Sequence, residues 1–216
     1  MSRFKGTPRG VLPGPLPAGE DLLWQGAPTF WALAKYAFRV QIVGAYFGFL
    51  ILLRVGAALV EGDPLKFSLG TGVTGLWLGA AALGMFCVLS SLIARSTTYT
   101  ITSKRVVITY GMALPKSVNL PFSRLEAADL RVNAEGTGDI VLKLPEQVRL
   151  SYLLLWPHVH GGKNGRAEPV LRGIADPRDV ARLLSEAIGQ TVPQGELVVT
   201  AAPVHEALET MQAHAA

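Results

Sequence analysis

Cysteine is almost absent from this chain of 216 residues, and charged residues are sparse. The single Cys87 cannot form an internal disulfide, and one thiol alone does not make a metal site. Asp, Glu, Lys and Arg make up 17% of the chain, with a formal net charge of +4. No stripe of Lys and Arg interleaved with aromatic residues occurs, which argues against nucleic acid as a partner.

The sequence also lacks the motifs of common catalytic sites. It has no glycine-rich phosphate loop, no nucleophile elbow and no HExxH motif. His158 and His160 lie two residues apart, which puts them on the same side of an extended strand. No acidic or cysteine partner follows them at metal-ligand spacing. We therefore predict a protein without catalytic activity, bound metal or cofactor.

Two long apolar runs are the main feature that is present, at Val40–Val60 and at residues 68–94. A transmembrane helix needs about 20 mostly apolar residues to cross roughly 30 Å of hydrocarbon. Only residues 61–67 separate the two runs. The sequence therefore predicts a transmembrane helical hairpin over residues 40–94. No signal peptide is expected, because the first run starts near residue 40 and is too long for one.

Basic residues flank the outer ends of this hairpin. Its turn carries Lys66 against Glu61 and Asp63. Because cytoplasmic flanks carry the excess of Lys and Arg, we expect both termini in the cytoplasm, at the inner (cytoplasmic or intracytoplasmic) membrane of a bacterium. The basic residues are Arg3, Lys5, Arg9, Lys35 and Arg39 before the hairpin, and Arg95, Lys104 and Arg105 after it.

The segments outside the hairpin differ in character. Residues 1–39 begin as an arm rich in Pro and Gly and end in an aromatic segment, in which Trp24 and Trp31 are expected to contact lipid at the membrane interface. Residues 190–216 form a tail, either loose or with a short helix after Pro203.

Residues 95–189 show the alternation and the Thr, Val, Ile and Tyr content of β-strands. A tight turn at Ser103-Lys104 and a later amphipathic helix over residues 176–189 complete the pattern. The expected fold is α+β, with a small antiparallel barrel or sandwich capped by that helix. Residues 148–159 are too short for a third span and are read as a buried strand. The expected strands lie within residues 96–111, 116–122, 125–133, 139–144, 149–156 and 169–174.

The hairpin carries three features that indicate contact with another protein. Gly44 and Gly48 form one GxxxG motif, and Gly75 and Gly79 form another, which allow close helix approach. Each motif either packs the two spans on each other or docks a partner's helices. Arg54 either extends to the membrane surface or pairs with a client subunit inside the membrane.

Outside the hairpin, Arg131, Trp156 and His158 are candidate partner contacts. Trp156 is alternatively a packing anchor at one end of the barrel. Basic residues near the membrane attract anionic headgroups, so further lipid contacts are expected at Lys104, Arg105 and Lys116.

Several motifs carry a family resemblance over residues 11–189. The residues Tyr99, Ile101, Thr102, Arg105 and Val106 resemble the motif that opens the pleckstrin-homology-like (PH-like) domain of bacterial membrane proteins. The segment LLLWPHV, with PVLRGIADPRDVARLLSEAI after it, resembles the photosynthetic-complex assembly proteins of the PuhB family.

The resemblance implies a non-catalytic membrane assembly factor, a chaperone of the photosynthetic reaction centre and secondarily of the light-harvesting 1 ring. Its implied partners are reaction-centre subunits, the H subunit among them, light-harvesting 1 polypeptides and the lipid bilayer; a homodimer is left open. The alternative is a general envelope protein whose PH-like domain binds anionic lipid or a peptide.

Overall fold

The computed structural model describes residues 16–62, 64–112, 114–133, 135–145, 148, 150–162 and 165–191. The chain divides into two compact units. The hairpin unit is Phe30–Ser96, and the β unit comprises the described residues through Thr29 and from Thr97 onward. The hairpin unit is thus an insertion into the β unit. This differs from the predicted division, in which the β domain begins only at residue 95. The predicted tail helix after Pro203 lies outside the described residues.

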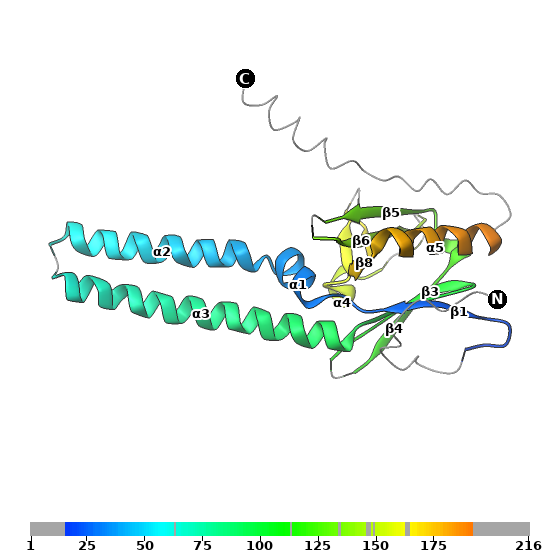
Figure 1. Cartoon of the computed structure of the whole chain (residues 1–216), viewed down its shortest axis with the longest axis horizontal. Coiled ribbons are helices and arrows are strands. Elements are labelled where there is room, and N and C mark those ends of the chain that lie inside the picture. The colour runs from blue at the N-terminus through cyan, green and yellow to red at the C-terminus, as the bar shows by residue number, and fades with distance from the viewer. Residues whose placement is uncertain are drawn as a thin grey trace, which may run out of the picture. The chain divides into compact units, whose positions relative to one another are not determined.

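The hairpin unit contains two long helices that run antiparallel, side by side (Figure 1). A short helical segment, α1 (Phe30–Ala32) followed by the π-helical turn η1 (Leu33–Ala37), precedes α2 (Val40–Val60) and α3 (Leu65–Ser96). Arg39 has a φ of 51°, and this left-handed conformation redirects the chain between η1 and α2. The two helices predicted from the apolar runs are present.

Both long helices are apolar enough, and long enough, to cross a membrane, over Val40–Val60 and Gly72–Ser96. Only 6% and 17% of these stretches are buried. A core helix of a soluble protein would be mostly buried. Large apolar side chains therefore cover the outside of the hairpin.

The β unit consists of two antiparallel sheets, with strand orders β1-β2-β3-β4 and β5-β6-β8-β7. The helix α5 (Pro177–Thr191) packs against β5 and β6 (Figure 1). The first sheet contains β1 (Leu22–Gly26), β2 (Thr98–Thr102), β3 (Arg105–Tyr110) and β4 (Lys116–Pro121). The second contains β5 (Ala127–Val132), β6 (Thr137–Lys143), β7 (Val159–Gly161) and β8 (Ala167–Ala175), after the short 3₁₀ turn η2 (Phe122–Arg124).

One hydrophobic core joins both sheets and α5. Alternate residues of each strand point inward, as the pleat requires. Val180, Leu184 and Ile188 recur every four residues along α5, so one stripe of that helix faces the sheets. The largest fully buried side chains of this core are Tyr99, Ile101, Ile108, Phe122, Ile140, Leu142, Leu171, Ile174, Leu184 and Ile188.

Two predictions about local structure are wrong. The aromatic segment before the hairpin contains β1, which pairs with β2 across 75 residues of sequence, Gln25 opposite Thr100. Trp24 is 9% exposed and belongs to the core, so it does not lie at the lipid interface predicted for it. Residues 149–156, predicted as a buried strand, contain the four-residue helix α4 (Tyr152–Leu155), whose Leu153 is exposed.

Candidate interaction site

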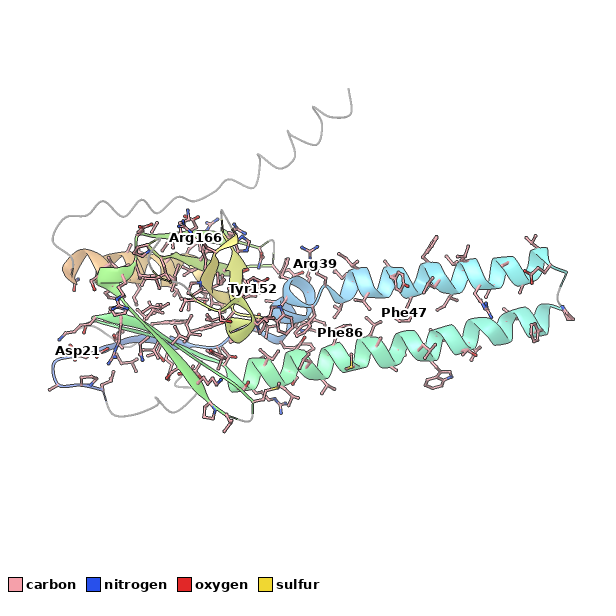
Figure 2. The ribbon with its side chains drawn as sticks, turned by 180° about the vertical axis from the view of Figure 1, so that it is seen from behind. Asp21, Arg39, Phe47, Phe86, Tyr152 and Arg166 are labelled. Carbon is pink, nitrogen blue, oxygen red and sulfur yellow. The ribbon has the colours of Figure 1, made fainter. Side chains whose placement is uncertain are left out.

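The glycines of α3 allow the two long helices to pack closely on each other. A Cβ placed on Gly75 would lie 2.8 Å from Cγ1 of Ile51, and one on Gly79 would lie 3.1 Å from Cβ of Phe47. These distances are below ordinary carbon–carbon contact. Figure 2 labels Phe47 on α2. The Gly75-x-x-x-Gly79 motif therefore faces α2. This agrees with the predicted alternative in which the motif packs the two spans on each other.

The glycines of α2 are less tightly packed than those of α3. A Cβ on Gly48 would meet no atom within 4 Å, and one on Gly44 would meet only Cδ1 of Leu83, at 3.9 Å. Gly56, two turns after Gly48, is equally open. Gly44 therefore faces Leu83 of α3, and of this motif only Gly48 has open space beside its backbone for another helix.

A groove of about 540 Å³ lies between α2 and α3. Its walls are mostly apolar, from Phe47, Leu50 and Leu78, with Arg54 and Thr74 as the polar side chains. The Thr74 hydroxyl donates to the Gly70 carbonyl, 3.4 Å away. Among the described residues, no acceptor lies within hydrogen-bonding reach of Arg54, and Glu61 does not pair with it. The guanidinium therefore brings a positive charge to an apolar groove, with no partner for it among the described residues.

In the β unit, the motif that carries the family resemblance forms the β2–β3 turn. The Thr102 hydroxyl accepts hydrogen bonds from the backbone N–H groups of Lys104 and Arg105, which fixes the turn. It also donates to Oε1 of Glu20, 2.6 Å away. The Arg105 guanidinium binds both carboxylate oxygens of Glu20, each at 2.7 Å.

Glu20 is almost completely buried within this network. The hydrogen bonds from Arg105 lower the pKa of Glu20 below its usual value, and Glu20 in turn raises the pKa of Arg105. The bidentate pair is therefore ionised at neutral pH and ties the chain before β1 to the β2–β3 turn. This places Arg105, a predicted lipid contact, in an intramolecular ion pair.

His158 joins the segment after α4 to β2. Its Nδ1 lies 2.7 Å from the Tyr99 hydroxyl, and its Nε2 lies 3.0 Å from Thr97 Oγ1. The Tyr99 hydroxyl also accepts from the Arg172 N–H at 3.1 Å. Burial lowers the pKa of His158 to about 3, with a contribution from the positive Arg172. His158 is only 1% exposed, so its side chain is a core group and not the surface contact predicted for it.

The candidate lipid contacts of the β unit do not gather on one surface. Lys104 follows β2 at the end remote from Thr97, which is about 17 Å away along the strand. Lys116 starts β4 opposite Tyr110, at the same end as Thr97, since Thr98 pairs with Thr109. Trp31, in the hairpin unit, is 71% exposed on α1. The basic residues thus lie at opposite ends of the sheet.

Two further candidate contacts lie on the surface of the β unit. Arg131 is exposed on β5, opposite Asp139 of β6. Trp156 is 44% exposed directly after α4, and precedes a cis peptide bond to Pro157. In the described part of the chain, no group of three or more His, Cys, Asp or Glu is placed to hold a metal ion.

Two features of the β unit were not predicted from the sequence: the partners of His158 and an exposed apolar pair in the β3–β4 connection. The ring contacts of His158 involve residues about 60 positions away, which no local pattern reveals. The exposed apolar residues Met112 and Leu114, in the β3–β4 connection, were also overlooked. Their signal was available, because two large apolar residues in a turn that contains Gly111 and Pro115 are unusual.

The two packed sheets with a terminal helix, after an apolar hairpin, define the class of protein. The chain belongs to the bacterial PH domain family, whose model matches residues 38–188. Over 197 residues it is also 34% identical to a protein of Rhodobacter capsulatus described as an uncharacterized 23.7 kDa protein in the puhA 5′ region. That match covers 90% of this chain and 92% of the relative. No solved structure matches.

Proposed function

We propose that this chain is a non-catalytic membrane assembly factor for the photosynthetic reaction centre and, secondarily, the light-harvesting 1 ring of a purple bacterium. The hairpin spans the inner membrane, with both chain termini in the cytoplasm. The β unit lies on the cytoplasmic side and contacts subunits while they assemble. Reaction-centre subunits, with H as one candidate, and light-harvesting 1 polypeptides are the proposed clients.

The observation that carries this proposal is the position of Arg54 in the apolar groove, where no described residue pairs with it. An Arg inside a membrane span costs about 2.5–3.5 kcal/mol on insertion scales, less where the side chain reaches the interface. Six residues separate Arg54 from the end of α2, about 9 Å of helix. An acidic or carbonyl group on a client helix that enters the groove would compensate the charge.

The relative supplies the functional context. Its printed description refers to the puhA 5′ region of Rhodobacter capsulatus, a location consistent with a role in photosynthesis. A PH-like unit attached to a membrane hairpin suits a recognition role, because the fold offers exposed strand edges and loops for binding other chains. Together these features favour an assembly role over a channel, since two apolar helices line no polar pathway.

Affinity purification tests the role of Arg54. A tagged chain is expressed in the phototrophic host, solubilised mildly and purified during the induction of photosynthesis. We expect reaction-centre or light-harvesting polypeptides to co-purify with the wild type. Arg54→Leu is expected to insert normally but to lose most of the co-purified client, whereas Arg54→Lys retains part of it because the charge persists.

Unchanged client recovery with Arg54→Leu, at equal protein levels in the membrane, would refute the ion-pair role. Leu52→Ala is the matched control, because Leu52 is exposed on the same helix, lies outside the groove lining and carries no charge. It is expected to leave recovery unchanged.

The alternative function, binding of anionic lipid by the PH-like unit, predicts salt-sensitive binding to anionic vesicles. The separation of Lys104 from Lys116, and the ion pair of Arg105, give that alternative no continuous basic surface. Binding to anionic vesicles that falls when Lys104→Ala and Lys116→Ala are combined would support it.

A further inference from the structure

Five large apolar side chains of the β unit are exposed in the part of the chain that the structure describes. They belong to two short segments, the β3–β4 connection and α4 with the residue after it. Leu153 is 88% exposed and Leu114 is 75% exposed. We call the set the apolar rim; its members are Met112, Leu114, Tyr152, Leu153 and Trp156.

Both segments of the rim lie next to His158 or to a residue that contacts it. Trp156 is two residues before His158, whose ring binds Tyr99 and Thr97 of the β2 region. The Tyr110 ring, one residue before Gly111 and the β3–β4 connection, lies 6.4 Å from the His158 ring. The rim is therefore a local feature of one end of the β unit, held together by the buried His158.

The same end of the β unit is where the chain passes into the hairpin. Thr97 directly follows the apolar stretch Gly72–Ser96 of α3. The Thr97 hydroxyl forms a hydrogen bond with the His158 ring. Thr29, the last residue before the hairpin unit, donates its N–H to the Gly173 carbonyl of β8. If α3 spans the bilayer, the membrane surface must lie within a few residues of Thr97, and hence close to the rim.

The composition of the rim suits a membrane interface. Trp and Tyr favour the headgroup level, because each has an apolar body and a polar tip. Leu and Met supply apolar area to the boundary of the acyl chains, and the exposed Lys116 at the same end suits anionic headgroups. The opposite end, at the Ser103-Lys104 turn, carries no exposed large apolar side chain among the described residues. Figure 2 shows Asp21, which bonds Ser103, and Tyr152 at opposite ends of the β unit.

We propose that the apolar rim inserts into the interface of the bilayer that the hairpin spans, and so fixes one end of the β unit against the membrane. This inference rests on the proposed membrane-spanning hairpin. A lipid-headgroup site at Lys104 and Arg105 would lie at the opposite end of the first sheet. The rim inference instead requires that the apolar side chains of the rim become buried in lipid. A client protein covering the rim is the competing outcome.

Environment-sensitive labels on the full-length chain test the inference. Cys87→Ser removes the native thiol, and single cysteines are introduced as Leu153→Cys, Leu114→Cys, Lys104→Cys or Leu52→Cys. Each is labelled with a polarity-sensitive fluorophore and reconstituted into vesicles of phosphatidylcholine and phosphatidylglycerol without other proteins. We expect labels at 153 and 114 to emit at shorter wavelength, and to be quenched by lipids with a spin label near the headgroup.

The label at 104 is the matched control, exposed at the far end, and is expected to remain in water. The label at 52, near the middle of α2 and exposed, reports spanning through quenching by lipids with a spin label deep in the acyl chain. Quenching at 52 without quenching at 153 or 114 would overturn the rim inference and leave the spanning hairpin intact. No quenching at 52 would remove the spanning hairpin and the inference with it. Shielding at 153 that occurs only when reaction-centre polypeptides are added would assign the rim to a protein partner and overturn the inference.

Discussion

At the scale of single residues, His158 fastens the segment after α4 to the start of β2 through both of its ring nitrogens. In the neutral ring one nitrogen donates and the other accepts, and hydroxyl groups can serve in either role. Burial in the core disfavours the protonated ring. Because the folded pKa is about 3, below the ordinary value of 6.5, protonation favours the unfolded chain.

His158 therefore predicts a loss of stability in acid. Its contribution is complete above about pH 6.5 and falls by about 1.4 kcal/mol per pH unit below it, until the folded pKa is reached. Between pH 7.5 and pH 5 we expect His158 to cost about 2 kcal/mol. Thermal unfolding of the purified full-length chain measures the change. His158→Gln should be less stable at pH 7.5 and should lose most of the acid sensitivity over this range, because burial lowers the pKa of His160 as well.

His160→Gln is the control, because His160 is only partly buried and lies two residues away. It should keep most of the wild-type acid sensitivity. Equal acid sensitivity in the wild type and His158→Gln would show that other groups cause it.

Glu20 is the second residue whose role depends on distant partners. We expect Glu20→Gln to lower stability by about 1–3 kcal/mol, because it removes a charged partner of Arg105 and Thr102. Thermal unfolding at pH 7.5 measures this loss. Lys104→Ala, an exposed neighbour in the same turn, should change stability by less than about 0.5 kcal/mol. Glu20→Gln with wild-type stability would contradict a structural role for the ion pair.

At the scale of elements, local patterns were sufficient where the signal was long or regular. The two apolar runs predicted α2 and α3, and alternation predicted β2 and β3 with their turn. The strand β1 was not predicted, because LLWQG is short and its pairing with β2 bridges the whole hairpin. The helix α4 was not predicted either, because a short apolar run has the same appearance in a strand and in a helix.

A Gly→Leu substitution is expected to have different effects on hairpin stability in the two glycine motifs. Gly75→Leu should destabilise the hairpin by about 1–3 kcal/mol, because its side chain would overlap Ile51. Gly48→Leu should leave hairpin stability nearly unchanged, since no atom lies within 4 Å of the added Cβ. Unfolding of the purified chain in detergent measures both.

The same pair of variants distinguishes packing from docking. Gly48→Leu is expected to reduce client co-purification although the chain itself is stable. If Gly48→Leu binds clients as the wild type does, the accessible face of α2 is not the docking face.

At the scale of the whole molecule, the hairpin is inserted between β1 and β2 of one PH-like unit. The pairing of these two strands holds the chain before the hairpin to the chain after it. The family, the hairpin and the β unit could be predicted from sequence because their motifs are local. The charge of Arg54 within a span could be predicted from sequence, whereas the groove that Arg54 lines emerged only from the packing of α2 on α3.

Deletion of the gene in a phototrophic host is the most direct test of the assembly function. Near-infrared absorption of the membranes records the reaction-centre and light-harvesting 1 bands together. We predict that both bands fall, the reaction-centre band first, and that the wild-type gene restores them while the Arg54→Leu gene restores them only in part. Bands of unchanged height in the deletion strain would contradict the assembly function.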